Sequence, residues 1–340
     1  MAAQLGLKIR GEFSLSPDST FTNHASYGAV PRMVQEERFR LLRLMETNPD
    51  RWFRKLLRPL YDEALEELAS FVCSDPTNLV FVQNVTSAVN IIVKALDLGP
   101  EDIVLSNSHT YESCRFAIDS AVKKSGADSL CMDISFPIEG EDDLVDQVVE
   151  TCKKNVSVKL VIIDHISSPS AIVFPVQKIC KELKKLGVLV LVDGAHAPGQ
   201  ISLNLEELGA DFYTGNLHKW CYAPRGSAFL WVSPDMQGQI EPLVTSHMYG
   251  QSMADQFFMQ GTADHTAYLC TRTGLQFYSQ SGGLPALLHH TQALLDWAAE
   301  MLVEAFNTEQ LQVPRNVRAP CIRVIGRNIS IYEILAFRVQ

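Results

Sequence analysis

The stretch VLVLVDGAH, residues 188–196, is the part of the sequence that decides the fold. Its first five residues are all valine or leucine, a composition typical of a strand that is buried on both faces. Asp193 follows them directly, at the mouth of that strand. Strands of this kind belong to sheets that are covered by helices on both sides. The stretch therefore predicts an α/β fold with a mostly parallel central sheet flanked by helices.

The same alternation of strand and helix patterns continues from residue 60 onward. Further short apolar runs predict strands at 79–82, 103–105, 130–134, 160–163, 211–214 and 228–232. Helical periodicity lies over 65–72, 89–96, 112–124, 143–153, 176–186 and 284–306. In parallel sheets the ligand lies beyond the carboxyl ends of the strands. The polar turns that follow the strand runs are therefore candidates for one common site.

The chain of 340 residues is long enough for two domains, or for one large domain with additions. Residues 1–60 show no sheet pattern and are interpreted as an N-terminal segment. Residues 61–283 are interpreted as the large α/β domain, which is expected to hold any cofactor. Residues 284–340 are interpreted as an interdomain helix followed by a shortened C-terminal small domain.

The composition argues against several classes of function. A net charge of −10 without a basic stripe disfavours a nucleic-acid partner. No apolar run approaches membrane length and the N-terminus is too polar for a signal peptide, so a cytoplasmic protein without a membrane partner is expected. The eight cysteines never fall as C-x-x-C and the histidines lack metal-ligand spacing, so no metal site is expected.

Lys219 lies in YTGNLHKW, residues 213–220, between two predicted strands and among few charges. Desolvation in such a setting lowers the pKa of a lysine and makes its amine a usable nucleophile and base. The amine can form a Schiff base with an aldehyde cofactor, and the Asp193 carboxylate can hold the pyridine nitrogen of that cofactor protonated. An isolated lysine is usually solvated and an isolated Asp-Gly is a common turn. The two together predict a pyridoxal-phosphate enzyme.

The cofactor's phosphate needs an anion site, and the turn after strand 79–82 can supply one. Thr86 and Ser87 begin the helix that follows, where backbone N–H groups and hydroxyls can hold a phosphate. The alternative is that Asn84 or Thr86 only caps the helix.

Two aromatic positions are candidates for contact with the cofactor ring. Tyr111 follows strand 103–105 and can stack on a planar ring, although a buried tyrosine is the bland alternative and His109 competes for the role. His196 can hydrogen-bond the phenolic oxygen of the cofactor, or it can be a structural histidine.

These pieces, in this order, resemble the class V aminotransferases, a family of fold-type I pyridoxal-phosphate enzymes. Within that family the chain is most similar to the isopenicillin N epimerase-like branch, which is related to the cysteine desulfurases. The most specific strings are VDGAHAPGQ at 192–200 and DFYTGNLHKWCYAPRG at 211–226. The others are NHASYGAVP at 23–31, QNVTSAVN at 83–90, SHTYES at 108–113, DHISSPSAIVFPV at 164–176 and QGTADHTAYL at 260–269.

The resemblance implies a role for each matching position. Lys219 would form the aldimine with pyridoxal 5′-phosphate, and Asp193 would pair with the pyridine nitrogen. The other implied contacts are His196 near the phenolic oxygen, Tyr111 over the ring, Thr86, Ser87 and His218 at the phosphate, Ser168 lining the site, and Asn23 and His24 at the substrate entrance. In family members a Gly-Thr pair like Gly261-Thr262 also contacts the phosphate of the cofactor that is bound in the other subunit. The resemblance at Thr262 therefore implies a homodimer.

The resemblance fades after the long helix. Family members carry a full small domain there, with an arginine that grips the substrate carboxylate. Residues 314–340 are short for such a domain, and Arg323 and Arg327 are only weak stand-ins for that arginine.

The expected function is action at the α-carbon of an amino-acid substrate. Epimerisation, elimination of a β-substituent such as a sulfur group, and transamination all begin with removal of the α-proton, and the sequence leaves the three outcomes open. The alternative is a catalytically impaired protein that keeps the cofactor fold as a scaffold. A nicotinamide-dependent enzyme is disfavoured because the chain has no G-x-G-x-x-G fingerprint.

Overall fold

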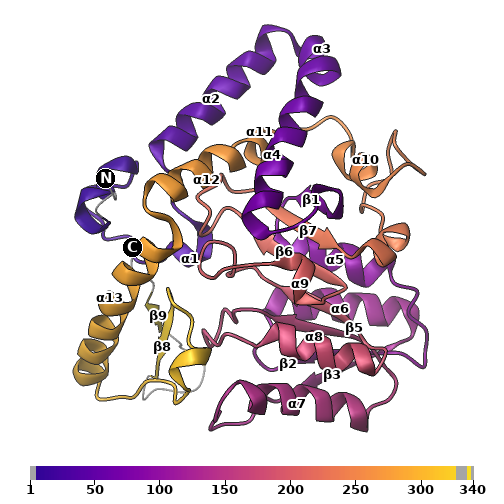
Figure 1. The fold of residues 1–340 in the computed structure, drawn as a ribbon, viewed down its shortest axis with the longest axis vertical. Helices are drawn as coiled ribbons and strands as arrows, with labels where there is room; N and C mark the ends of the chain where they lie inside the picture. The colour runs from indigo at the N-terminus through magenta and orange to yellow at the C-terminus, as the bar shows by residue number, and fades with distance from the viewer. Residues whose placement is uncertain (1–4, 327–334, 338–340) are drawn as a thin grey trace.

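A computed structural model describes residues 5–326 and 335–337 of the chain. At its centre lies a seven-stranded sheet with the strand order β1-β7-β6-β5-β4-β2-β3 (Figure 1). Strands β3, β2, β4, β5 and β6 run parallel to one another, whereas β7 is antiparallel to both β6 and β1. The bounds are β1 Leu79–Val82, β2 Ile103–Asn107, β3 Asp128–Met132, β4 Val158–Asp164, β5 Leu189–Asp193, β6 Phe212–Asn216 and β7 Ala228–Val232.

Different helices cover the two faces of this sheet. Alternate residues of β4 belong to two separate apolar clusters, as the two-residue period of a strand requires. One cluster contains α5 and α6, and the other contains α7 and α8. The bounds are α5 Val85–Ala95, α6 Glu112–Ser125, α7 Glu141–Lys154 and α8 Val176–Lys185. The middle strands are therefore buried on both faces, which is why their sequences are nearly continuous runs of valine, leucine and isoleucine.

The remaining helices lie mostly at the two ends of the described chain (Figure 1). A π-helical turn, Trp52–Leu56, joins α3 to α4. β8 (Arg323–Ile325) pairs with β9 (Leu335–Phe337) beside the long helix α13. No helix in these residues is both long and apolar enough to cross a bilayer. The bounds are α1 His24–Tyr27, α2 Arg32–Thr47, α3 Pro49–Arg51, α4 Leu57–Val72, α9 Leu205–Leu208, α10 Met253–Phe258, α11 Thr266–Leu269, α12 Thr271–Gln280 and α13 Gly283–Phe306.

The structure confirms the predicted fold class and contains every strand and helix expected from the sequence. β3 differs most from its expected range, because it begins at Asp128 and ends at Met132 instead of covering 130–134. Most of its residues are exposed, so its apolar pattern is weak. Helix α4 runs through residue 60, which places the expected border of the N-terminal segment inside a helix. The division into domains remains a prediction.

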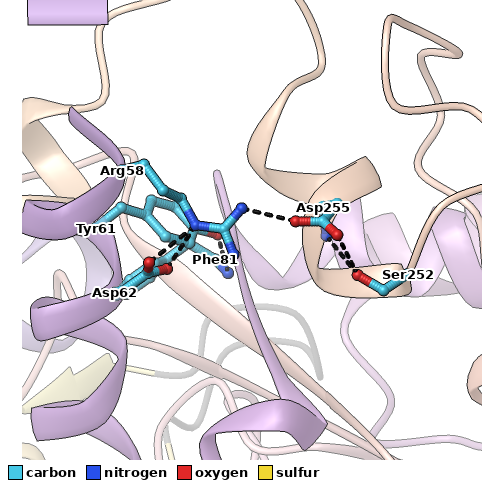
Figure 2. A network of polar contacts seen from close by, with 6 residues as sticks. All are labelled: Arg58, Tyr61, Asp62, Phe81, Ser252 and Asp255. Carbon is cyan, nitrogen blue, oxygen red and sulfur yellow. Dashed lines mark hydrogen bonds and ion pairs between the residues drawn. The ribbon is translucent and has the colours of Figure 1, made fainter. Parts of the chain in front are cut away.

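Helix α4 covers the free edge of the sheet at β1. The hydroxyl of Tyr61 accepts a hydrogen bond from the backbone N–H of Phe81 in β1, at 3.2 Å (Figure 2). One turn earlier, Arg58 donates to Asp62 on the same helix and to Asp255 on α10. A single helix therefore satisfies an edge strand and holds α10 in place, which protects the edge from pairing with another chain.

We expect Tyr61→Phe to lower the free energy of unfolding by about 1–3 kcal/mol, because the buried N–H of Phe81 loses its acceptor. Urea denaturation followed by circular dichroism measures this loss. Tyr268→Phe is the matched control: the Tyr268 ring stacks on Phe81, but its hydroxyl makes no hydrogen bond within the described residues. Equal losses in the two variants would show that the hydroxyl of Tyr61 does not stabilise the edge.

Candidate active site

The predicted polar turns meet at one edge of the sheet. β1, β2, β4, β5 and β6 run in the same direction, so their carboxyl ends share that edge. The turns after these strands carry the side chains that the sequence singled out. In strand order they are Thr86 and Ser87, Tyr111, Ser168, Asp193 and His196, and His218 and Lys219.

Asp193 ends β5 and is only 3% exposed. Its Oδ1 accepts a hydrogen bond from the backbone N–H of Ala195 at 2.9 Å, and its Oδ2 accepts one from the thiol of Cys114 on α6 at 3.3 Å. Burial raises the pKa of Asp193, whereas these two hydrogen bonds and the positive charge of Lys219 lower it. The carboxyl group is thus held by three groups from separate parts of the chain.

Lys219 lies in the turn between β6 and β7, and its Nζ is 3.1 Å from Nε2 of His196. His196 is buried and stands three residues after Asp193. The structure therefore brings together the lysine, the histidine and the aspartate that the sequence selected. Lys219 is itself partly buried, unlike a typical surface lysine.

His24 supports the Lys219 turn from the side of the backbone. Its Nε2 donates to the carbonyl oxygen of Lys219 at 2.8 Å, and its Nδ1 accepts from the N–H of Ala29 at 3.2 Å. Burial lowers the pKa of His24 to about 4, so the ring is neutral at physiological pH. A Cβ on Gly28 would collide with the carbonyl oxygen of His218, so only glycine permits this close approach. The sequence placed His24 at the substrate entrance, but both ring nitrogens bind main-chain atoms.

The N-terminus of α5 shows how its polar residues are used. Asn84 is the N-cap: its Oδ1 accepts from the N–H of Ser87 at 2.8 Å and from the Ser87 hydroxyl at 3.1 Å. The hydroxyls of Thr86 and of Ser113 on α6 lie 3.1 Å apart. The capping alternative therefore holds for Asn84, while Thr86 remains at the first turn, where an anion can approach.

The other predicted residues occupy different surroundings. Tyr111 is 48% exposed at the start of α6, so its ring is not part of the core. His218 bonds the carbonyl oxygen of Ser227 through Nδ1 at 3.1 Å, and burial lowers its pKa to about 4. Asn23 precedes α1, Thr262 lies in the loop after α10, and both residues are exposed.

Arg323 does not supply a free guanidinium for a substrate carboxylate. It donates to the carbonyl oxygens of Ala319 and Ile322 and to Asp296 of α13. It therefore fastens β8 to the long helix. Arg327 lies outside the described residues.

Sequence reasoning missed two residues of this site. Cys114 looked like one of several scattered small hydrophobes, and nothing in its pattern shows that its thiol faces Asp193. Asp164 did carry a signal, because it follows the apolar run 160–163 just as Asp193 follows 188–192. It stands beside Asp193 at the end of β4.

Comparison with known proteins identifies the family. A family model described as aminotransferase class V matches residues 36–337. The chain belongs to this family. It is 29% identical to the probable L-cysteine desulfhydrase, chloroplastic, of Arabidopsis thaliana, over 93% of this chain and 70% of that protein. It is 30% identical to the isopenicillin N epimerase of Amycolatopsis lactamdurans, over 78% of this chain and 67% of that protein.

The fold is also similar to that of a solved structure. A complex of the cystine C–S lyase C-DES with its reaction product cysteine persulfide superposes with a TM-score of 0.79 at 19% identity, over 92% of this chain and 84% of that one. Together these findings confirm the expected family, the fold-type I architecture and the expected enzyme class with its cofactor, pyridoxal 5′-phosphate.

The residues present fit this cofactor. The buried carboxyl group of Asp193 can face a pyridine nitrogen. The amine of Lys219 lies close enough to Asp193 to lower the pKa of that carboxyl group. The α5 N-terminus, which carries the Thr86 hydroxyl, suits a phosphate. An exposed aromatic ring, Tyr111, stands at the same edge of the sheet. The chain thus offers a group for each part of the cofactor.

We expect His24→Gln to destabilise the protein at neutral pH by about 1–3 kcal/mol, because one of two buried main-chain groups loses its partner. The deficit should shrink as pH falls from about 6.5 toward 4. Over that range the unfolded wild-type chain takes up a proton that the folded His24 refuses, so the wild type loses stability that the variant keeps.

Chemical denaturation at a series of pH values measures this difference. His289→Gln on the exposed surface of α13 is the matched control and should show a flat, near-zero difference. A deficit in His24→Gln that stays constant across the range would contradict a neutral, buried His24.

Proposed function

We propose that the protein is a pyridoxal-phosphate enzyme that works at the α-carbon of a sulfur-containing amino acid and releases the sulfur group from the β-carbon. The observation that carries this proposal is the meeting of Lys219, His196 and the buried Asp193 in a class-V chain. Similarity to a probable L-cysteine desulfhydrase covers 93% of this chain and similarity to a hercynylcysteine sulfoxide lyase covers 96%, against 78% and 87% for two isopenicillin N epimerases, which favours C–S cleavage.

The residues of the chain divide the chemical work. When bound, pyridoxal phosphate supplies an electron-accepting ring that stabilises negative charge at the α-carbon. Asp193 holds a negative charge at a fixed position for the protonated ring nitrogen. The Nζ of Lys219 removes the α-proton, and His196, 3.1 Å away, orients that amine. With L-cysteine and water as reactants, the balanced products are pyruvate, ammonia and hydrogen sulfide.

The cysteines of the chain favour release of the sulfur over its transfer to the enzyme. All eight lie in the described residues. Cys221, two residues after Lys219, is fully buried, and burial raises its pKa well above the ordinary value for a thiol. A persulfide acceptor has to be a reachable thiolate, and a buried neutral thiol is a poor one. The two exposed cysteines, Cys73 after α4 and Cys131 in the edge strand β3, lie outside the turns that carry the site residues.

We expect the purified protein with pyridoxal phosphate to absorb visible light and to release pyruvate with an equal amount of sulfide from L-cysteine, or with an equal amount of the corresponding thiol from an S-substituted cysteine. Lys219→Ala should lose the borohydride-sensitive absorption and at least about a hundredfold of the rate, because the amine is lost both as the cofactor's attachment point and as the base. Cys221→Ala should keep the rate, because a buried thiol takes no part.

Three results would contradict this proposal. A preparation that stays colourless after pyridoxal phosphate is added would show that the protein does not bind this cofactor. Sulfide release equal to that of Lys219→Ala would favour a catalytically impaired scaffold. Racemisation of the α-carbon without loss of sulfur would favour the epimerase alternative.

We also propose that the enzyme works as a homodimer in which Thr262 contacts the phosphate of the partner subunit's cofactor. Thr262 is exposed, in a loop whose ends are tied down by ion pairs of Asp255 with Arg58 and of Asp264 with Arg38. An exposed threonine in such a loop is accessible to a second copy of the chain. Thr262→Ala should weaken cofactor binding by about tenfold or more, the value of a hydrogen bond to a charged group.

Mixing Lys219→Ala with Thr262→Ala tests this arrangement. In a dimer of Lys219→Ala with Thr262→Ala, the site that keeps Lys219 receives Thr262 from the other chain, so tight cofactor binding at that site should return. No recovery on mixing, or a monomer in analytical ultracentrifugation, would contradict the shared site.

A further inference from the structure

Asp164 and Asp193 form a pair of carboxyl groups at the floor of the site. They end the adjacent parallel strands β4 and β5 and lie directly opposite each other in the sheet register. Residues in register on neighbouring strands project to the same face of a sheet. Both side chains are only 3% exposed, so water cannot screen one charge from the other.

The two carboxyl groups differ in how they are held. Asp193 accepts the N–H of Ala195 and the thiol of Cys114, one at each oxygen. Asp164 has one oxygen, Oδ2, that is buried without a hydrogen-bond partner among the residues that the structure describes. A negative charge is stabilised by hydrogen bonds to its oxygens, so the charge belongs on Asp193. An ionised carboxylate with a buried oxygen that accepts no hydrogen bond would carry an uncompensated desolvation cost.

We propose that Asp164 is a positioning residue that stays a neutral carboxylic acid, so that the two side chains together carry one negative charge and that charge lies on Asp193. Its role toward the cofactor rests on the proposed function: a single, fixed charge at Asp193 matches the single charge of a protonated ring nitrogen. Its neutral state is a property of the protein alone.

The electrostatic surroundings agree with this assignment. Burial raises the pKa of Asp164 well above its ordinary value, and the charge of Asp193 raises it further. Three groups lower the pKa of Asp164: its own backbone N–H, the hydroxyl of Thr110 and the positive charge of Lys219. Their effects are smaller than those of burial and of the Asp193 charge. Burial raises the pKa of Cys114 and of Tyr213, so the thiol and the phenol near the pair stay neutral. Burial also lowers the pKa of His165, next to Asp164 in the chain, to about 4, so that imidazole is neutral too.

Cofactor-free protein provides the first test, because it needs no activity. Above about pH 4 the unfolded chain ionises Asp164 while the folded chain keeps its proton. The wild type should therefore lose stability relative to Asp164→Asn as pH rises from 4 to 8, and the ratio of their unfolding constants should grow by up to tenfold per pH unit. Asparagine has the size of the neutral acid and cannot ionise.

Asp235→Asn on the exposed surface is the matched control, and its stability difference from wild type should not change with pH. A constant difference for Asp164→Asn, or one that favours the wild type as pH rises, would overturn the proposal. Difference infrared spectroscopy is the second readout: the wild type at neutral pH should show a protonated carboxyl band that is missing from Asp164→Asn. If the asparagine variant does not fold, Asp164→Ser replaces it, and absence of the band from the wild type overturns the proposal.

The loaded enzyme adds a readout that a merely structural role would not move. Asp164→Asn should keep the visible spectrum of the bound cofactor and its pH midpoint, because it copies the neutral acid. Asp193→Asn should shift both, because it removes the charge. If the protein binds no cofactor, these spectra vanish but the stability and infrared results still decide the state of Asp164.

Discussion

Burial of the Asp193 carboxyl group is the constraint on which the site depends. Helices cover β5 on both faces, so the residue at its end cannot be reached by enough water to stabilise a charge. The protein compensates with a backbone N–H, the thiol of Cys114 and the amine of Lys219. These groups come from the turn after β5, from α6 and from the turn after β6. The helices and turns around the strand ends are therefore coupled through one carboxyl group.

The position of Lys219 depends in turn on residues far away in the sequence. His24 and Gly28 belong to the N-terminal segment, yet they contact the backbone of residues 218 and 219. The imidazole of His24 bridges two main-chain groups. Gly28 lets the N-terminal segment approach residue 218 so closely that any side chain at position 28 would collide with it. The N-terminal segment is therefore part of the active site, although it contributes no strand to the central sheet. The N-terminal segment thus contacts the main chain of the Lys219 turn, while the side chain of Lys219 contacts His196.

The sequence predicted the sheet well because burial on two faces leaves a strong trace. The runs 160–163 and 188–192 locate β4 and β5 to within a few residues. The expected range of β3 was displaced because that strand begins with two polar residues, Asp128 and Ser129. Lys219 and Asp193 were found because a charged group beside an apolar run would be buried, and a buried charge requires a compensating partner. The same signal marked Asp164, but only the strand register shows that it faces Asp193. The hydrogen bonds of His24 could not be predicted from the sequence, because its partners are main-chain atoms, which every residue carries.

A neutral Asp164 changes how the charges of the site balance. Without the cofactor, Asp193 carries one negative charge and Lys219 is the cation close enough to lower its pKa. If Asp164 were also ionised, a single lysine would face two buried carboxylates, and the excess charge would favour unfolding. With one proton kept on Asp164, the lysine alone balances the floor of the site. Under the proposed function, a protonated ring nitrogen would take over that balance, so the amine of Lys219 would lose its charge and act as a base without leaving Asp193 uncompensated.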